Sequence, residues 1–473
     1  MTDQRRIGAI VMAGGRGVRM RSPKPKMLMP ILGMPLVYFP TALAARAVRG
    51  PVVVVSGDSI DEISAEVARS LPDEELRFAR QEKPLGTADA VKAGMTELDD
   101  VDHVVILNGD VPGTSDELMA KLVSRHFSRD LDLTVLAFRT ETPHGYGRIV
   151  YDDSGVIECI KEQKELSEDE EELDLVNAGM YVARCSVLRE FLKVVEPSPT
   201  QKEYLLTDFV AYVAQRTSKV GLVVTKELCE VSGVNNRLEL SEALRQLRTL
   251  RNRKLMLAGV GMPQPESVDV DFGVEIGENT TLEAGVAIRG NSRVGAHCHV
   301  GRGVVIEDTT IADDVHILPY CMLESSQIAD GCKIGPFAHT RPGTVLHTGA
   351  KLGNFVETKK TILGEGSKLN HLSYVGDAVI GKKVNVGAGT ITCNYDGYNK
   401  FKTVLEDGVF IGSDTQLVAP VTVGKNALVA AGTTVTKDVP AEALVISRCE
   451  QVNKEGGAKR QRERALAEKN KKS

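Results

Sequence analysis

The chain has 473 residues, too many for one hydrophobic core, and its 42% hydrophobic and 26% charged residues are typical of a globular protein with two or three domains. Its net charge of −6 gives no basis for nucleic-acid binding, and no apolar run reaches the roughly 18 residues of a membrane span. The eight scattered cysteines form no CxxC pair and the start of the chain is not a signal peptide, so we expect a cytoplasmic protein without disulfides or zinc.

Residues 1–237 alternate short apolar runs with amphipathic stretches. The runs IGAIVMAG, PVVVVSG, HVVILNGD and LDLTVLAF are rich in β-branched residues and several end in Gly or Asp. This pattern is typical of strands in an α/β sheet that is buried on both faces. We therefore predict an α/β domain with a Rossmann-like mixed sheet, from which the acidic run 161–174 projects into solvent.

A glycine-rich turn follows the first predicted strand. Gly14, Gly15 and Gly17 allow a tight turn whose N–H groups can face a phosphate, and Arg19 and Lys26 add positive charge. The turn is neither GxGxxG nor a P-loop, and on its own it fits a purely structural turn equally well.

Asp110 comes directly after another buried strand, in NGDVP. A carboxylate at that edge of an α/β sheet can hold Mg²⁺ against phosphate oxygens, although it can also simply cap the next helix. Asn235 or Asn236, in GVNNRLEL, offers a second oxygen ligand.

The next segment, residues 238–260, repeats leucine at helical spacing without Gly or Pro until its end, which predicts one long connecting helix. From 261 to 455 a six-residue repeat takes over, with one aliphatic residue per hexad and Gly often following it. Such hexads predict a parallel β-helix with a column of aliphatic side chains inside. The aliphatic hexad positions are Ile276, Leu282, Ile288, Val294, Val300 and Ile306.

Residues 456–473 are basic, and we predict a solvated, disordered tail.

The hexads stop between 390 and 403, where TITCNYDGYNKFKT forms a polar, aromatic and lysine-bearing interruption. Insertions in repeat proteins gather on the binding face, because the repeats themselves have little room for a site. The interruption therefore predicts a ligand site in the second half.

Several short motifs occur in a recognisable order: the glycine-rich loop, LGT, GDVP, GYGRI, NAG, TD and GVNNRLEL, followed by the hexads. From about residue 7 to 455 the chain resembles the bacterial bifunctional N-acetylglucosamine-1-phosphate uridyltransferases / glucosamine-1-phosphate acetyltransferases. That family has a left-handed β-helix and forms homotrimers, and its product feeds cell-wall and lipopolysaccharide synthesis. The chain departs from the family pattern at Val18, Pro84, Asn108, Ala178, Ser232 and Asn370.

For the first half the resemblance implies uridyl transfer from UTP to N-acetylglucosamine 1-phosphate with release of pyrophosphate. Mg²⁺ would be held by Asp110 and Asn235, and Arg19 and Lys26 would offset phosphate charge. The implied UTP residues are Ala13, Gly14, Gly15, Lys26, Gln81, Gly86 and Thr87, and the implied sugar residues are Gly145, Glu162 and Asn177.

For the second half the resemblance implies acetyl transfer from acetyl-CoA to the amine of glucosamine 1-phosphate, with His371 as the base because imidazole titrates near neutrality. A histidine with a structural role remains an alternative. The implied glucosamine 1-phosphate residues are Arg341, Lys359, Tyr374, Asn385 and Lys400, and the implied acetyl-CoA residues are Ala388, Asn394, Tyr395, Ser413, Ala431 and Arg448.

Three alternatives remain open. The chain could be a single-activity sugar-1-phosphate nucleotidyltransferase whose β-helix is only structural, or a non-catalytic assembly subunit with a degenerate first half. Cys393 could act as an acyl nucleophile, although nothing in its local sequence supplies a base.

The loop at 390–403 would close its own site or that of a neighbouring subunit.

Overall fold

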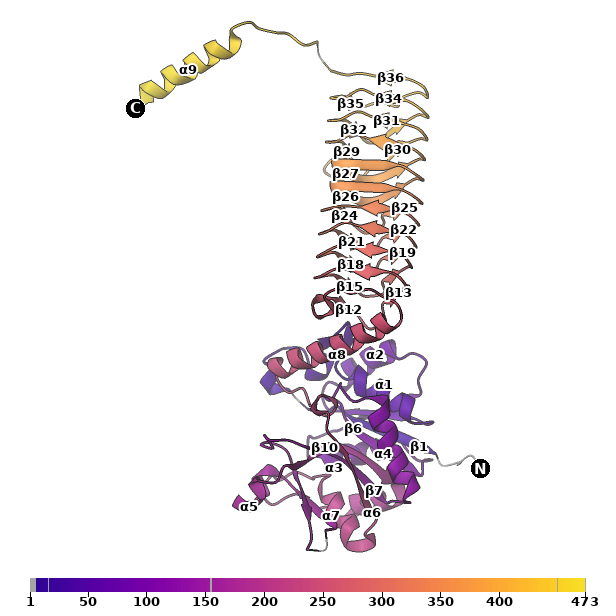
Figure 1. Cartoon of the computed structure of the whole chain (residues 1–473), viewed down its shortest axis with the longest axis vertical. Coiled ribbons are helices and arrows are strands. Elements are labelled where there is room, and N and C mark those ends of the chain that lie inside the picture. The colour runs from indigo at the N-terminus through magenta and orange to yellow at the C-terminus, as the bar shows by residue number, and fades with distance from the viewer. Residues whose placement is uncertain (1–5, 16, 154, 449, 473) are drawn as a thin grey trace. The chain divides into compact units, whose positions relative to one another are not determined.

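The computed structural model describes residues 6–15, 17–153, 155–448 and 450–472 (Figure 1). The chain divides into two compact units: Met1–Lys254 with Asp269–Gly273, and Leu255–Val268 with Val274–Ser473. The first boundary lies beyond the predicted 237, because most of the long helix belongs to the first unit. No helix in the described part of the chain is both long and apolar enough to span a membrane.

The first unit is built on a mixed sheet with strand order β11-β7-β10-β6-β1-β4-β5. β10 runs antiparallel to both of its neighbours, and the other pairs in this order are parallel. The predicted mixed α/β sheet is therefore confirmed. The strands are β1 (Ile7–Met12), β4 (Val52–Ser56), β5 (Leu76–Arg80), β6 (His103–Asn108), β7 (Leu133–Arg139), β10 (Leu175–Arg184) and β11 (Val220–Thr225). In addition, β8 (Arg148–Tyr151) pairs with β10, and β9 (Ile157–Lys161) pairs with β8.

Helices cover both faces of this sheet. Ile10 belongs to one buried core, whereas its neighbours Ala9 and Val11 belong to a second one, as expected when successive strand residues point to opposite faces. The first core includes residues of α3, α6 and α7, and the second includes residues of α1, α2 and α4. These helices are α1 (Tyr38–Ala47), α2 (Ile60–Ser70), α3 (Thr87–Met95), α4 (Asp116–Ser128), α6 (Cys185–Val194) and α7 (Asp208–Thr217).

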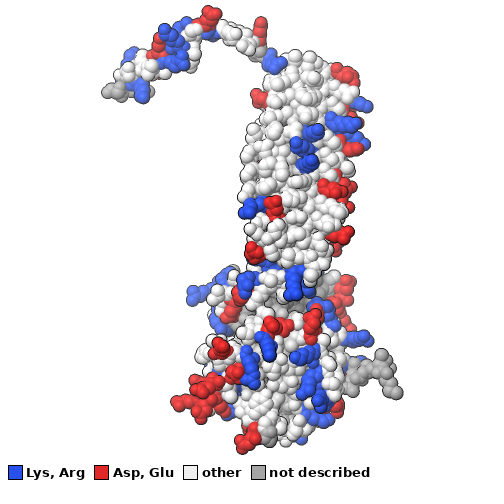
Figure 2. Space-filling model, in the orientation of Figure 1, with Lys and Arg blue, Asp and Glu red and all other residues white. Residues whose placement is uncertain are grey.

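Two charged segments lie outside these cores. The acidic run carries the short helix α5 (Glu168–Glu171), and Figure 2 shows acidic side chains gathered over it. The tail was predicted to be disordered, and this prediction is corrected: Gly457–Lys472 form helix α9, along which Figure 2 shows mainly basic side chains. Ala, Leu, Arg, Lys, Gln and Glu dominate α9 and favour helix on their own, even though its side chains from Ala458 to Lys471 are exposed.

The connecting helix α8 spans Arg237–Leu257, close to the predicted 238–260. Leu247 is buried in a third cluster with Phe39 and Val234, and Leu240 and Leu244 pack against it. The leucines at the ends of the helix, Leu238 and Leu257, are instead exposed. One face of α8 therefore packs on the first unit.

The second unit is a parallel β-helix of stacked coils, which confirms the predicted architecture; its handedness remains a prediction. Three short strands make one coil, because each strand pairs with the third one after it. Paired inward residues such as Val294, Ile311 and Ile328 are 17 residues apart, and all three are buried. One column of strands comprises β13 (Glu275–Ile276), β16 (Arg293–Val294), β19 (Thr310–Ile311), β22 (Gln327–Ile328) and β25 (Val345–Leu346).

Farther along the chain the coils carry two longer strands, β26 (Lys351–Leu363) and β27 (Lys368–Ile380). The following strands are β28 (Asn385–Val386), β29 (Ile391–Cys393), β30 (Thr403–Leu405), β31 (Phe410–Ile411), β32 (Gln416–Val418), β33 (Val421–Val423), β34 (Leu428–Val429), β35 (Thr434–Val435) and β36 (Leu444–Val445).

The interruption of the hexads is an insertion between β29 and β30. Tyr374 pairs with Ile391, 17 residues later, whereas Ala378 pairs with Thr403, 25 residues later. The coil therefore carries eight extra residues, which leave the wall as a loop. A bridge between Tyr395 and Lys400 closes this loop on itself.

Close stacking of the coils makes a prediction at Gly353. A Cβ at this position would lie 1.7 Å from the carbonyl oxygen of Asn370 on the next coil, so Gly353→Ala forces backbone apart and should cost about 3 kcal/mol. Gly349→Ala is the control, because nothing lies within 4 Å of its Cβ and only its φ of +67° is unfavourable, at about 1 kcal/mol. Scanning calorimetry should show the larger loss of thermal stability for Gly353→Ala, and equal losses would contradict the close stacking.

Candidate active sites

The glycine-rich turn after β1 lines a cavity of about 300 Å³ in the first unit. Ala13, Gly14, Gly15 and Gln81, all predicted to bind UTP, lie in its wall together with residues 56–59, Glu82 and Pro84. β1, β4 and β5 are parallel neighbours, so the segments that follow them meet at one edge of the sheet. The fold thus places a ligand-sized cavity at the edge where α/β sheets bind nucleotides.

The wall around Gln81 is held rigidly. Its amide Nε2 donates to the carbonyl oxygen of Gly86 at 3.1 Å and to Oδ2 of Asp89 at 2.9 Å. Gly86 has a φ of +125°, and a Cβ there would lie 2.3 Å from the carbonyl oxygen of Tyr204, so only glycine fits. The hydroxyl of Thr87 accepts a hydrogen bond from the N–H of Leu206 at 2.9 Å. Gly86 and Thr87 therefore support this wall rather than line the cavity, and Asp89 is a supporting residue that the sequence did not indicate.

Lys26 is buried and joins the two predicted metal ligands. Its Nζ lies 2.6 Å from Oδ2 of Asp110 and 3.2 Å from Oδ1 of Asn235. Asn236, the other candidate, accepts hydrogen bonds from the N–H groups of Leu238 and Glu239 and thereby caps α8. Asn235 is therefore the asparagine that shares a site with Asp110.

The oxygens of Asp110 and Asn235 suit a magnesium ion. Both face one ammonium group, so they converge on one point. Mg²⁺ prefers such oxygen ligands and typically takes only one or two from the protein, while water and substrate phosphates supply the others. The described part of the chain contains no cluster of three or more His, Cys, Asp or Glu side chains that could form an all-protein cage.

Arg19 is exposed and lies on the 3-10 helix Val18–Met20. Within the described residues, no hydrogen bond or ion pair joins it to Lys26 or Asp110. Of the four predicted catalytic and metal-binding residues of this unit, the structure brings together Lys26, Asp110 and Asn235, but not Arg19.

The three predicted sugar residues lie on or beside paired strands. Gly145 precedes β8, Glu162 follows β9 and Asn177 is on β10, and β8 pairs with both of the other strands. The N–H of Gly145 donates to Oε1 of Gln163 at 3.0 Å, and the amide of Asn177 donates to the hydroxyl of Tyr181 at 2.7 Å. Hydrogen bonds within the protein thus orient the polar groups of Gly145 and Asn177.

Glu162 sits in an acidic neighbourhood. Burial raises the pKa of its carboxyl, although a 2.9 Å hydrogen bond donated by Thr207 partly offsets this rise. Burial, followed by the carboxylates of Glu165 and Glu162, raises the pKa of Asp208 to about 6. The sequence motif TD thus supplies one hydrogen-bond donor and one neighbouring acid to the site.

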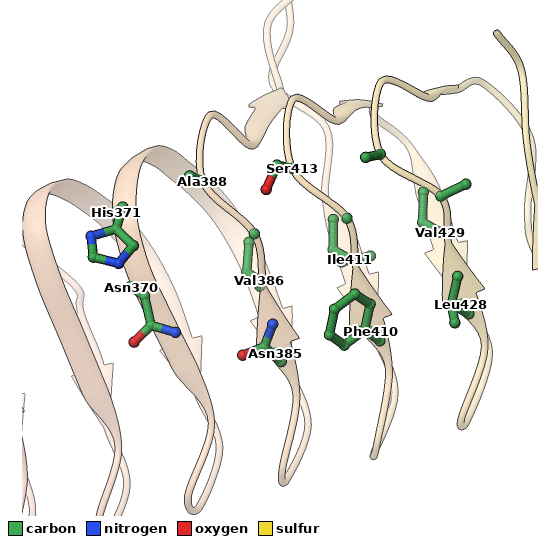
Figure 3. A pocket seen from close by; sticks show the side chains of 14 residues that line it. Asn370, His371, Asn385, Val386, Ala388, Phe410, Ile411, Ser413, Leu428 and Val429 are labelled. Atoms are coloured by element: carbon green, nitrogen blue, oxygen red, sulfur yellow. The ribbon is translucent and has the colours of Figure 1, made fainter.

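The second unit has a cavity of about 460 Å³ along the outside of its coils (Figure 3). Its walls repeat one four-residue pattern on three successive coils: 385–388, 410–413 and 428–431. Asn370 and His371 lie at one end. Five residues of the predicted acetyl-transfer site therefore lie in one cavity: His371, Asn385, Ala388, Ser413 and Ala431.

His371 is oriented by a residue of the preceding coil. Its Nδ1 lies 2.6 Å from Oδ1 of Asn354, with which it pairs in register. An amide oxygen only accepts hydrogen bonds, so Nδ1 carries the proton and Nε2 is left with a free lone pair. This is the tautomer that a general base with a reactive Nε2 needs. The sequence did not indicate Asn354, because its relation to His371 depends on the register between the coils.

Three cations of the second unit lie close together. Lys400, followed by Arg341, lowers the pKa of Lys359, as neighbouring positive charges do. Arg341 is balanced in part by Glu357, whose Oε1 lies 2.8 Å from Nη1. Lys359 and Tyr374 lie on the long strands β26 and β27, and Lys400 lies on the inserted loop. Such a cluster can bind a phosphate group.

The remaining predicted residues lie outside the cavity wall. Asn394 is buried at the base of the loop and donates to Oδ2 of Asp377 at 2.6 Å, whereas Tyr395 is exposed. Arg448 donates to the carbonyl oxygen of Ala431 at 3.0 Å and so lies beside a wall residue.

A mixed α/β sheet with a cavity at its edge and a β-helix with a histidine in a surface groove together define a two-domain transferase of the sugar-nucleotide class. Family models agree with this division. The nucleotidyl transferase model matches residues 8–228, the GMPPB C-terminal domain model matches 270–353, and the model of the bacterial transferase hexapeptide (six repeats) matches 402–437.

Curated relatives match nearly the whole chain. The bifunctional protein GlmU of Trichlorobacter lovleyi is 42% identical, with 96% of this chain and 98% of the relative covered. GlmU of Geobacter sulfurreducens is 42% identical, with 97% and 99% covered, and GlmU of an Anaeromyxobacter species is 44% identical, with 97% and 94% covered. The chain belongs to the family of bifunctional GlmU proteins.

The hydrogen bond between His371 and Asn354 predicts the tautomer of the free protein. Nitrogen-15 NMR of neutral His371 should show a protonated Nδ1, whereas free imidazole side chains favour a protonated Nε2. Replacing the acceptor in Asn354→Ala should shift His371 toward the Nε2-protonated form. His347, another histidine of the β-helix, serves as the internal reference. An unchanged His371 spectrum would show that Asn354 does not fix the ring.

Proposed function

We propose that the chain makes a UDP-activated amino sugar in two steps, with one site in each unit. As a GlmU family member it is a bifunctional enzyme, an acetyltransferase and a uridyltransferase. The substrates of the first step are acetyl-CoA and glucosamine 1-phosphate, and those of the second are UTP and N-acetylglucosamine 1-phosphate. The observation that carries the proposal is the His371–Asn354 pair at the end of a groove that runs along successive coils of the β-helix.

Acetyl transfer takes place at His371. The amine nitrogen of glucosamine 1-phosphate attacks the thioester carbonyl carbon while Nε2 of His371 accepts the proton of the amine. The carbon–sulfur bond then breaks, and the CoA thiolate leaves and takes up a proton. The proton on Nδ1, held by Asn354, keeps Nε2 free for this role.

The phosphate of the amino sugar is bound by the cation cluster of Arg341, Lys359 and Lys400. Lys400 and Arg341 repel the ammonium of Lys359 and lower its pKa. A dianion that binds between the three cations relieves this repulsion. Tyr374 and Asn385 complete this subsite, and Asn394 and Tyr395 lie between it and the thioester. Ala388, Ser413, Ala431 and Arg448 lie along the path of acetyl-CoA.

The transfer is direct, without an acyl-enzyme. Within the described residues the thiol of Cys393 makes no hydrogen bond to a base, which a nucleophilic cysteine requires. His371, in contrast, has both an orienting partner and a place in the cavity wall.

Uridyl transfer takes place at the glycine-rich turn. A phosphate oxygen of N-acetylglucosamine 1-phosphate attacks the α-phosphorus of UTP, and pyrophosphate leaves. Lys26 and Arg19 offset the phosphate charge, and Ala13, Gly14 and Gly15 form the wall against the nucleotide. Asp110 and Asn235 would hold Mg²⁺, which neutralises charge on the phosphates when it is bound. Gln81, supported by Gly86 and Thr87, lies at the base subsite.

The acceptor sugar of this step binds where β8, β9 and β10 meet. Glu162 accepts hydrogen bonds from sugar hydroxyls and is held by Thr207, and Asn177 and Gly145 present polar groups beside it. This assignment gives a role to a half-buried carboxylate whose pKa is raised chiefly by burial.

We further propose that the chain works as a cytoplasmic homotrimer. In the second unit Tyr320, Phe337 and Phe355 stack in one exposed column, with ring centroids 5.4 Å apart at each step. An exposed aromatic column with the periodicity of the coils suits a second β-helix packed beside it. The loop at 390–403 would then serve its own or a neighbouring site.

A single-activity nucleotidyltransferase with a structural β-helix is the alternative. It would give no role to the His371–Asn354 pair or to the cluster of cations around Lys359. These features favour two activities.

Two substitutions separate the sites. His371→Ala removes the base and should lower kcat of acetyl transfer by about 10²- to 10⁴-fold while uridyl transfer is unchanged. Asp110→Asn should do the reverse and lower uridyl transfer by at least about 100-fold. Release of CoA thiol and of pyrophosphate is measured separately with each purified variant. If one substitution abolished both activities, the assignment of one site to each unit would be wrong.

A further inference from the structure

The groove of the second unit runs along successive coils, with Asn370 and His371 at one end (Figure 3). In the repeating pattern of its wall, the third position holds Gly387, Gly412 and Ala430, and the fourth holds Ala388, Ser413 and Ala431. The paired register of β27, β28, β31 and β34 continues this pattern one coil back, where the third and fourth positions are Asn370 and His371. Large polar side chains replace the small ones there.

Asn370 differs in size and polarity from the residues at the same position of the neighbouring coils. The same position of the coil before it is Gly353, so glycine stands on both sides of Asn370. Figure 3 shows Asn370 and His371 together at one end of the lining side chains, with Leu428 and Val429 at the other. Within the described residues the carboxamide of Asn370 has no hydrogen-bond partner, and it lines the cavity. Glycine occupies this position in the neighbouring coils, so the packing of the coil wall does not require asparagine here.

The position of the base fixes the direction of a bound thioester. The carbonyl carbon must lie near His371, and the remaining length of the groove extends only over the coils that follow. The carrier arm therefore lies over the small residues, and the alkyl part of the acyl group, on the far side of the carbonyl from sulfur, points toward Asn370.

We propose that Asn370 is the end wall of the thioester groove and limits the acyl group to the size of acetyl. This inference rests on the proposed acetyl transfer. An acyl group one carbon longer would meet the carboxamide, whereas glycine at this position would extend the groove toward Gly353.

The test compares acetyl-CoA with propionyl-CoA and butyryl-CoA, each with glucosamine 1-phosphate, for the wild type, Asn370→Gly and Asn370→Ala. Both replacements occur at the same position of other coils, so the fold accommodates them. The matched control is Ala430→Gly, which alters the third position at the opposite end of the groove.

The kcat/KM ratio of propionyl-CoA to acetyl-CoA should rise by about tenfold or more in Asn370→Gly, and less in Asn370→Ala, because one methylene changes binding by this order. The ratio should stay at the wild-type value in Ala430→Gly.

An unchanged ratio in both Asn370 variants would overturn the inference. A raised KM for glucosamine 1-phosphate with an unchanged ratio would also overturn it, because Asn370 would then contact the acceptor. If the wild type released no CoA thiol from acetyl-CoA, the proposed acetyl transfer itself would fail, which is a different result from either of these.

Discussion

Each coil of the β-helix lies directly on the one before it, and its inward aliphatic side chain packs on the inward side chain of its neighbour. Val386, Ile411 and Val429 form one such column, paired in register and buried. The same register determines what lies outside the wall: residues 17 positions apart become neighbours, so Asn354 meets His371. A slip of one residue would turn an aliphatic side chain outward and remove both the core and the site.

The first unit depends on a related constraint. Parallel strands β1, β4 and β5 end at one edge, so the glycine-rich turn and Gln81 meet there although they are far apart in sequence. The buried ammonium of Lys26 links Asp110, which follows β6, to Asn235, which precedes α8. In both units the alignment of the strands brings the site residues together, and a few hydrogen bonds orient their polar side chains.

Much of this could be predicted from the sequence, because hydrophobic period and motif order are local signals. The hexads placed Leu282 and Val294 inside, and the break at 390–403 located the inserted loop. The pairing of His371 with Asn354 could not be predicted, since the spacing between paired residues varies from 16 to 18 along the coils and reaches 25 across the inserted loop. Helix α9 was also missed, because a basic composition was read as disorder although its residues favour helix.

One chain performs two transfers in sequence at separate sites. This is tested in a single reaction of the wild-type protein with glucosamine 1-phosphate, UTP, Mg²⁺ and acetyl-CoA, in which CoA thiol and pyrophosphate are followed together. Thiol should appear first, pyrophosphate should follow after a lag, and omission of acetyl-CoA should suppress pyrophosphate. Pyrophosphate released at the same rate without acetyl-CoA, or no release of thiol at all, would contradict the account.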